Sequence, residues 1–310
     1  MNLSNLKQLE SEYKSEKMNK HEYIRRMHDN HKILFEYGSF IKNKDIKKIE
    51  IKDNQVVMTT RENGIKLICD EFDHRIVPIE ILNFDFYEKD EINLILKLIK
   101  ENDIILDIGA NIGWYSLKIA KNINNVKILA FEPIPKTFKY LKDNIHLNRI
   151  SGIKTFNYGF SDKEKDITFY YYHEGSCNAS AANLSGKKDV NKIICRLTTL
   201  DKFTESKNIA IDFIKCDVEG SELFVFKGGI KTIKKNKPII FTELLRKRAA
   251  KFDYHPNDVI SLLMENGYGC FTINCGNLNE IDKIDEKAEE TNFLFLNNEK
   301  HSDLIKLYKK

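Results

Sequence analysis

A short apolar segment that ends in an acid and then turns through two glycines constrains the fold of this chain most strongly. Residues 104–106 are apolar, Asp107 follows them, and Gly109 and Gly113 frame a turn into a helix-like segment. A parallel α/β sheet forms a nucleotide-sized crevice in this way, at the carboxyl end of a strand. Glycines let a ligand approach the backbone, and the start of the helix supplies free N–H groups. The sequence therefore predicts a nucleotide-like ligand at this turn.

Strand-like and helix-like segments alternate from residue 103 onward, which is typical of a mostly parallel sheet flanked by helices. The apolar fraction of 42% over 310 residues is enough for a substantial core. The predicted strands are 103–107, 126–131, 153–157, 211–216, 238–242, 268–273 and 292–296. The predicted helices are 88–100, 113–122, 135–147, 220–235 and 256–266. Two further strand-like pieces, 166–172 and 193–197, interrupt the alternation and are expected beside the site.

The chain before residue 88 has a different pattern and is expected to form two smaller units. Residues 1–45 carry apolar side chains at helical spacing among many charges and are predicted to be a helical arm. Residues 46–87 contain strand-like runs between turn signals and are predicted to be a small β subdomain. Residues 88–310 are predicted to form the main domain. The arm is expected to pack on its own domain, to cover the substrate, or to pair with a second subunit in a homo-oligomer.

Composition argues against several classes of protein. The 50 basic and 46 acidic residues give a net charge of only +4, without the concentrated basic surface of a nucleic-acid-binding protein. No apolar run reaches the roughly 18 residues of a membrane span, and the N-terminus lacks an apolar signal segment. The six cysteines stand singly, which favours buried free thiols in a reducing compartment over a zinc site. We expect a cytoplasmic protein that neither spans a membrane nor binds nucleic acid.

The spacing of the glycines and the acid before them indicate one kind of cofactor. Gly109 and Gly113 stand too far apart for a dinucleotide fingerprint, which needs closely spaced glycines that admit a pyrophosphate. Asp107 would repel a phosphate, but it attracts the ammonium and sulfonium groups of S-adenosylmethionine. Glu132 ends the next predicted strand, about twenty residues beyond the turn, where a carboxylate accepts hydrogen bonds from ribose hydroxyls. An ordinary strand-to-helix turn has the same short pattern, so the prediction depends on Asp107 and Glu132 together.

Several separate segments carry a resemblance to a known family, namely 106–116, 131–135, 144–148, 159–162, 197–201 and 212–222. The last of them reads Asp-Phe-Ile-Lys-Cys-Asp-Val-Glu-Gly-Ser-Glu, and Pro238 and Glu243 follow it. Through these segments the sequence resembles the FkbM family of S-adenosylmethionine-dependent methyltransferases over roughly residues 65–275. The resemblance implies a Rossmann-like class I methyltransferase fold of the α/β class. Such a fold has a seven-stranded, mostly parallel sheet whose last strand is antiparallel.

The resemblance also implies which residues bind the cofactor. They are Asp107, Gly109, Asn111, Gly113, Tyr115, Phe131, Glu132, Pro133, Ser161, Asp162 and Asp217. The glycine turn would surround the methionine end, Glu132 would hold the ribose, and Phe131 and Pro133 would hold the adenine. Ser161 and Asp162 would lie near the adenine amine, although Ser-Asp-Lys is also an ordinary turn.

Methyl transfer to a hydroxyl requires groups that align the acceptor and remove its proton. Asp217 and Glu219 follow the strand 211–216, which lies beside the first strand in such sheets and ends at the same crevice. Asp217 is the leading candidate for the general base or for a group that orients the acceptor. Glu219 is a second candidate, or an acid that only favours the start of a helix.

Two further residues are weighed for the chemistry. Glu243 ends the next strand, and acids at both strand ends raise the alternative of a divalent metal ion, which is not favoured because no third oxygen ligand is evident. His255 is an alternative base with a suitable pKa range, or an exposed residue before a helix that begins at Pro256.

The acceptor is expected to be a sugar. Residues 170–183 combine aromatic and small polar side chains, and the basic residues that could hold a phosphate or uronic acid are Arg246, Lys247, Arg248 and Lys251. With the resemblance, these features predict an O-methyltransferase acting on a sugar, nucleotide-sugar or glycan hydroxyl in bacterial surface polysaccharide biosynthesis. The alternatives are an O-methyltransferase for a non-carbohydrate small molecule and a catalytically inactive cofactor-binding subunit.

Overall fold

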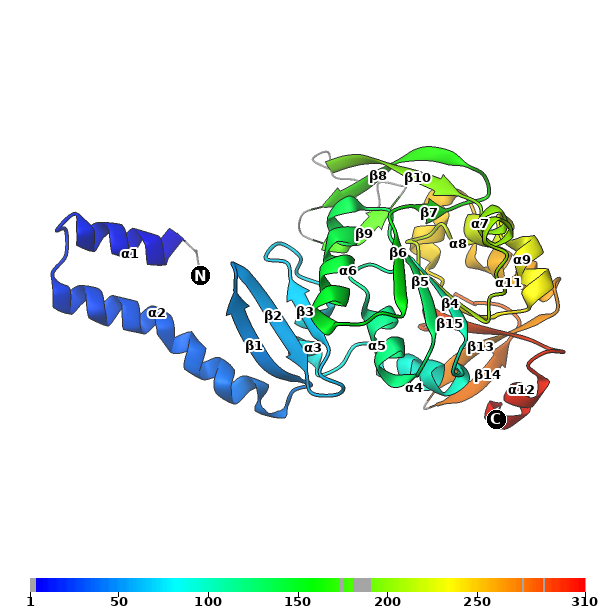
Figure 1. Cartoon of the computed structure of the whole chain (residues 1–310), viewed down its shortest axis with the longest axis horizontal. Helices are drawn as coiled ribbons and strands as arrows, with labels where there is room; N and C mark the ends of the chain where they lie inside the picture. Colours follow the sequence, from blue (N-terminus) through cyan, green and yellow to red (C-terminus); the bar gives the residue numbers. More distant parts are fainter. Residues whose placement is uncertain (1–3, 173–174, 181–190, 275, 287, 310) are drawn as a thin grey trace.

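The computed structural model describes residues 4–172, 175–180, 191–274, 276–286 and 288–309. Its main sheet has eight strands in the order β14-β13-β15-β12-β11-β4-β5-β6 (Figure 1). They are β4 Ile104–Ile108, β5 Lys127–Phe131, β6 Ile153–Phe156, β11 Phe213–Cys216, β12 Ile239–Glu243, β13 Tyr268–Asn274, β14 Asn277–Ile281 and β15 Asn292–Asn297. The strands from β6 to β12 are parallel neighbours, and β15 runs antiparallel between β12 and β13. This is the expected Rossmann-like α/β sheet with its last strand antiparallel.

The sheet has one strand more than the seven predicted. The additional edge strand, β14, pairs with β13 in an antiparallel hairpin that turns at Gly276, where φ is +77°. Its sequence, Asn-Leu-Asn-Glu-Ile, has a single buried residue, Leu278. A short edge strand with so few apolar positions gives little signal in a sequence.

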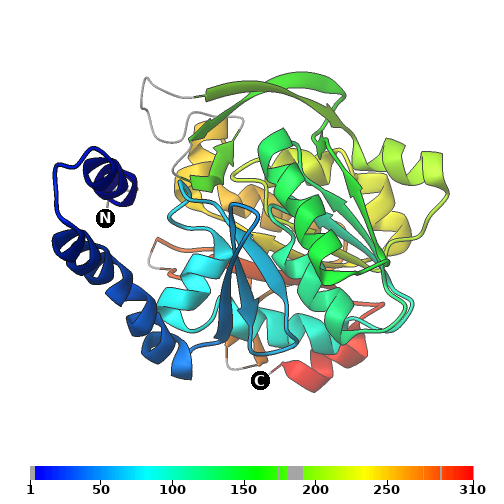
Figure 2. The ribbon, with the colours of Figure 1, turned by 60° about the vertical axis from the view of Figure 1, so that its left-hand side comes forward.

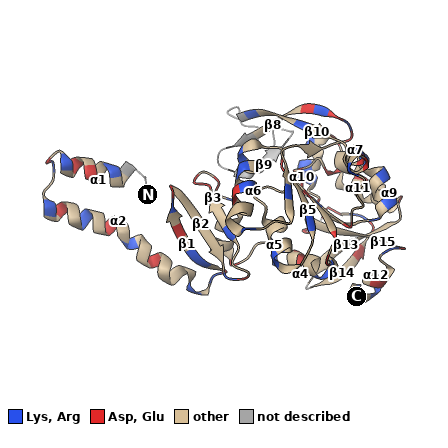
Figure 3. Cartoon of the chain, in the orientation of Figure 1, with Lys and Arg blue, Asp and Glu red and all other residues tan. Residues whose placement is uncertain are grey.

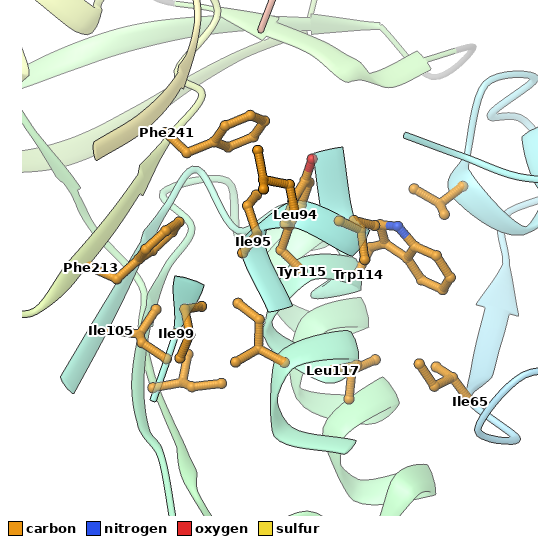
Figure 4. Close-up of a cluster of buried hydrophobic side chains, with 14 of the residues drawn as sticks. Ile65, Leu94, Ile95, Ile99, Ile105, Trp114, Tyr115, Leu117, Phe213 and Phe241 are labelled. Atoms are coloured by element: carbon orange, nitrogen blue, oxygen red, sulfur yellow. The ribbon is translucent and has the colours of Figure 1, made fainter. Parts of the chain in front are cut away.

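Helices cover both faces of the sheet. One face packs on α4 (Lys89–Leu98), α5 (Trp114–Asn122) and α6 (Pro135–Asn148). The other packs on α7 (Leu200–Lys207), α8 (Glu222–Lys227), α9 (Ile230–Asn236) and α11 (Pro256–Met264). Strand side chains alternate between the two cores, so Phe213 enters the first and Ile214 the second. Figure 4 shows part of the first core, where Ile95 and Leu117 lie between the strands and the N-terminal sheet.

The segment predicted as one helix over 220–235 is two helices, α8 and α9, which meet at Gly228 and Gly229. A Cβ atom at Gly228 would lie 2.0 Å from the carbonyl oxygen of Ser161, so only glycine allows this approach. The prediction of a single helix was wrong because apolar residues keep helical spacing across the break. The break places the end of α8 against residue 161.

A second sheet has the strand order β7-β10-β8-β9. Its strands are β7 Gly159–Phe160, β8 Lys165–Tyr172, β9 Gly175–Ser180 and β10 Asn191–Thr198. The predicted extra strands at 166–172 and 193–197 correspond to β8 and β10. Most of the segment 170–183, predicted to contact the acceptor, lies outside the residues whose side chains the structure describes.

The N-terminal part begins with a helical hairpin of α1 (Ser4–Lys14) and α2 (Lys20–Phe40), which stands away from the rest of the molecule (Figures 1 and 2). The short helix η1 (Ile41–Asn43) leads from it into an antiparallel sheet. The elements that follow are β1 Ile46–Lys52, β2 Gln55–Thr60, β3 Lys66–Cys69 and α3 Val77–Phe84. Side chains of this sheet share a core with α4 and α5. The division into 1–45, 46–87 and 88–310 stays a prediction.

The short elements that complete the chain are α10 Arg246–Ala249, η2 Ala250–Phe252 and α12 Ser302–Tyr308. The cysteines that the structure describes as free thiols are Cys69, Cys195, Cys216 and Cys270. Within the described ranges, none of the helices has the length and apolar character needed to cross a lipid bilayer.

Candidate functional site

A pocket lies at the carboxyl ends of β4, β5 and β11, beside the second sheet. Seven of the residues predicted from the sequence line it, namely Gly109, Asn111, Glu132, Pro133, Ser161, Asp217 and Glu219. Apolar side chains form much of the remaining wall, namely Ile108, Ile134, Phe160, Ile167, Phe169, Leu197, Val218, Phe224 and Phe252. The pocket therefore combines carboxylates that follow β5 and β11 with an apolar wall.

The glycine turn is fixed by its neighbours. Gly109 has φ +73°, and a Cβ atom there would lie 1.8 Å from the carbonyl oxygen of Asp217. The backbone N–H groups of Gly109 and Ala110 donate hydrogen bonds to the carbonyl of Phe131, at 3.0 and 2.9 Å. Gly113, with φ +93°, starts α5 and does not line the pocket. The turn thus joins the ends of β4, β5 and β11.

Asp107 lies beneath this turn rather than in the pocket wall. It is 1% exposed, and its Oδ2 accepts a hydrogen bond of 2.6 Å from the hydroxyl of Ser116. The Nζ atom of Lys215 lies 3.7 Å from Asp107 Oδ1 and 3.6 Å from Asp217 Oδ2, and donates to the carbonyl of Gly109 at 2.7 Å. One buried cation thus stands between two acids.

Lys215 is a residue that the sequence reasoning missed. Burial alone would lower its pKa, but the charges of Asp217, Asp107 and Glu88 outweigh burial and raise it. The ammonium therefore stays charged. A lysine in the otherwise apolar strand β11 was the signal that could have revealed it.

Glu132 lies in the pocket wall with both carboxylate oxygens already engaged. Its Oε2 accepts a hydrogen bond from the backbone N–H of Asn111 at 3.1 Å, and its Oε1 from that of Ile134 at 2.9 Å. Burial raises the pKa of Glu132 to about 7. The side chain can therefore be carboxylate or carboxylic acid near neutral pH, and both forms can bind a hydroxyl.

The adenine-side residues divide between pocket and core. Phe131 is fully buried and stacks on Phe156, with ring centroids 4.8 Å apart, so its predicted contact with adenine is wrong. Strand alternation turns Phe131 into the core. Ser161 lines the pocket, while Asp162 accepts a hydrogen bond from it at 2.9 Å without lining the pocket. Burial raises the pKa of Asp162, but the bond from Ser161 and the charge of Lys165 outweigh it and lower the pKa.

The loop after β11 is organised by Glu222, which the sequence reasoning also missed. Its Oε1 accepts hydrogen bonds from the backbone N–H groups of Val218 and Gly220, both at 3.0 Å. Its Oε2 accepts a bond of 3.1 Å from the hydroxyl of Tyr254. The loop needs left-handed backbone at Glu219 and Gly220, with φ values of +58° and +100°. A buried acid two residues after a glycine therefore holds Asp217 and Glu219 at the pocket.

Glu219 and Glu243 share one cation. Arg248 Nη1 lies 2.5 Å from Glu219 Oε2 and 2.6 Å from Glu243 Oε2. Burial raises the pKa of Glu243 to about 8; the charge of Asp217 adds to this effect and Arg248 opposes it. Burial likewise raises the pKa of Glu219 well above its usual range. Glu243 does not line the pocket, and Arg248 is engaged by these acids rather than presented to an anionic acceptor.

Tyr115 faces a different group from the one predicted. It is buried and does not line the pocket; its hydroxyl donates a 2.6 Å hydrogen bond to Glu88 Oε2. Asn292 donates to Glu88 Oε1 at 3.3 Å. Burial raises the pKa of Glu88, the bond from Tyr115 opposes this, and the charge of Asp217 adds to it. Glu88 therefore belongs to the same group of charges as Asp217, although no motif identified it.

His255 lies outside the pocket. It is exposed and caps α11, where its Nδ1 accepts a hydrogen bond from the backbone N–H of Asn257 at 3.1 Å. The backbone N–H of His255 donates a hydrogen bond to the carboxylate of Asp258. The prediction of a catalytic base at this position is therefore wrong, and the alternative of a residue that precedes a helix holds. The described residues contain no group of three or more acids, histidines or cysteines arranged to hold a metal ion.

Comparison with known proteins gives a consistent result. The family model described as Methyltransferase FkbM domain matches residues 107–270, just over half of the chain. Hexuronic acid methyltransferase AglP from Haloferax volcanii is 32% identical over 143 residues, which are 46% of this chain and 56% of that protein. A tRNA (guanine(37)-N(1))-methyltransferase from Pediculus humanus subsp. corporis is 30% identical over 128 residues, 37% of this chain and 27% of that protein. The chain spans less than two thirds of the length of these relatives.

Among solved structures, methyltransferase FkbM from Methylobacillus flagellatus KT matches with a TM-score of 0.41 and 16% identity. The match covers 64% of this chain and 44% of that chain.

Proposed function

Because the chain belongs to the FkbM family of methyltransferases, we propose that it transfers a methyl group from S-adenosylmethionine to a hydroxyl of a sugar. The pocket at the ends of β4, β5 and β11 carries this proposal, since it joins the glycine turn, Glu132 and Asp217 in one cavity. The name of the hexuronic acid methyltransferase relative favours a sugar acceptor. A place in bacterial surface polysaccharide biosynthesis is part of the same proposal.

The residues present fit the cofactor. Within the described part of the chain, Asp107 Oδ1 and Asp217 Oδ1 are buried and accept no hydrogen bond. With Lys215 between them, the two carboxylates keep a net negative charge, which suits a cationic ligand group. Glu132 is available to the ribose, and the apolar wall around Ile134 and Phe160 to the adenine. When bound, S-adenosylmethionine supplies an activated methyl group on its sulfonium.

We assign the orientation of the acceptor hydroxyl to Asp217. Its side chain is 35% exposed and lines the pocket. Glu219 and Glu243 are held by Arg248, and the raised pKa of Glu243, about 8, suits proton exchange near neutral pH.

The proposal is tested in two steps. Calorimetry with S-adenosylhomocysteine and NAD checks the cofactor, and binding of NAD alone would contradict it. Turnover of S-adenosylmethionine is then measured on a panel of sugars, nucleotide sugars and glycans, with and without a chelator. At saturating S-adenosylmethionine, Asp217→Asn should lose about 10²–10⁴-fold in turnover. Asp253→Asn, which changes an exposed acid, is the matched control and should keep full turnover.

The same panel distinguishes the alternative acceptors. Turnover of a non-carbohydrate hydroxyl compound, with none on sugars, would favour a small-molecule O-methyltransferase. Methylation of RNA would support the activity named for the tRNA methyltransferase relative and contradict the expectation of no nucleic-acid partner. Cofactor binding without turnover on any acceptor would favour an inactive subunit.

A further inference from the structure

The helical hairpin at the N-terminus leaves half of its longer helix uncovered. The helix α1 has 11 residues and α2 has 21, so α1 can cover only about 16 Å of a helix of about 31 Å. Asn5 donates a hydrogen bond to Asn30, and the rings of Tyr13 and Tyr23 stack with centroids 4.4 Å apart. These contacts place α1 against the first half of α2.

Residues 31–40, the second half of α2, are all exposed. They nevertheless include large apolar side chains, which are Ile33 (39% exposed), Leu34 (57%), Phe35 (75%), Tyr37 (40%) and Phe40 (46%). A helix of this length without a packing partner is marginal in water. A half-helix with so many bare apolar groups therefore requires a partner.

The bare residues continue the stripe that α1 covers. The half-buried positions in the first half of α2 are Glu22, Tyr23, Arg26, Met27 and Asn30. At 3.6 residues per turn, Ile33, Leu34, Tyr37 and Phe40 extend the same face, whereas Phe35 lies on the opposite face. A helix packed along this face would take the place that α1 takes in the first half.

We propose that the partner is a second copy of this chain, and that the bare halves of the two α2 helices pack antiparallel about a two-fold axis. With roughly 200 Å² for a large side chain, the four exposed residues of the stripe offer on the order of 360 Å² of apolar surface per copy. Two copies together bury about 700 Å² of apolar surface, which is the apolar share of a specific interface of about 1,200 Å². The hairpin stands clear of the body, so a second copy can reach this face (Figures 1 and 2).

The charges beside the stripe fit this arrangement. Figure 3 shows positively and negatively charged residues interspersed along α2. This mixture does not favour an anionic partner such as RNA or a lipid surface. Lys32 and Glu36 lie on one flank of the stripe, and a two-fold axis brings the same flanks together. Lys32 of each copy then faces Glu36 of the other, with Leu34 near the axis. The ion pair between Lys32 and Asp29 is exposed, and breaking it costs little because exposed ion pairs are weak.

Sedimentation of the full chain over a dilution series tests the proposal. The unmodified chain should sediment as a dimer. The double variant Leu34→Glu with Tyr37→Glu should raise the dimer dissociation constant by at least about tenfold, because it buries charge in the contact. Phe35→Glu is the matched control on the opposite face and should leave the dimer intact. Far-UV circular dichroism and S-adenosylhomocysteine binding check that each variant is folded.

A charge reversal tests the antiparallel register. Glu36→Lys should weaken the dimer, and adding Lys32→Glu to it should restore the affinity. A monomeric unmodified chain overturns the proposal, as does a Phe35→Glu variant that dissociates as fully as the double variant. Failure of the paired reversal to restore the dimer also overturns it. None of these outcomes depends on the proposed methyl transfer.

Discussion

Replacing Lys215 by methionine removes a buried positive charge from between two carboxylates. The ammonium lies 3.7 Å from Asp107, 3.6 Å from Asp217 and 2.7 Å from the carbonyl oxygen of Gly109. Methionine keeps the unbranched apolar stem and fills irregular space, so the charge and its hydrogen bond are the main loss.

The expected cost follows from burial. Removing one partner of a buried ion pair costs about 3–5 kcal/mol, because the remaining charge stays buried without compensation. Asp107 is 1% exposed, so this range applies to it. The side chain of Asp217 is 35% exposed, and water replaces part of its compensation. We expect Lys215→Met to lose about 3–4 kcal/mol of unfolding free energy at neutral pH.

The loss should depend on pH. Since the two acids raise the pKa of Lys215, its contribution in the unmodified chain is present below the ordinary lysine range and lost only as the pH rises through the raised pKa. In the variant, protonation of an uncompensated carboxylate relieves the cost, so the difference should shrink toward acid pH. Urea unfolding at about pH 5 and about pH 8 measures this change on the acid side. Lys127→Met, an exposed lysine of β5, is the control. Equal stability of Lys215→Met and the unmodified chain at the higher pH, or a loss independent of pH, would refute this reasoning.

Three further outcomes are expected. Gly109→Ala should lower the melting temperature sharply, since its Cβ atom would lie 1.8 Å from the carbonyl of Asp217; a normal melting curve would contradict the close approach. Burial raises the pKa of Glu132 to about 7, so its contribution to stability is present below its unfolded pKa near 4.5 and is lost as the pH rises through about 7. Glu132→Gln should remove this part of the pH dependence in urea unfolding. It should also weaken S-adenosylhomocysteine binding, measured by calorimetry. Glu222→Ala leaves the N–H groups of Val218 and Gly220 without their acceptor and should cost about 1–3 kcal/mol, measured by urea unfolding, with reduced turnover. An unchanged stability of Glu222→Ala would show that the loop after β11 keeps its conformation without the Glu222 carboxylate.

The sequence predicted the parallel part of the fold well because local pattern and tertiary structure agree there. The backbone from Asp107 to Gly113 can adopt few conformations, because a buried strand is followed by two glycines with left-handed backbone. The gathering of Gly109, Glu132 and Asp217 follows from the same argument, since parallel strands end at one edge. That they bind a cofactor stays a prediction.

The errors and omissions concern contacts between distant segments. Phe131 and Glu132 are consecutive, yet one enters the core and the other the pocket, and only strand alternation decides which. The break at Gly228 depends on a carbonyl of residue 161, and Lys215 acquires its role from acids on other strands. Periodicity along one segment contains none of this information.

The contact between Glu88 and Asn292 has a consequence for how the site is assembled. The two residues are 204 positions apart, and both lie outside the span 107–270 that the family model matches. Closing so long a loop costs entropy before the contact offsets it. We expect the glycine turn to form within its own strands, while the hydrogen bonds to Glu88 are completed only when both flanks of the chain have docked. An excised fragment covering 107–270 would retain the turn but lack the hydrogen bond between Asn292 and Glu88.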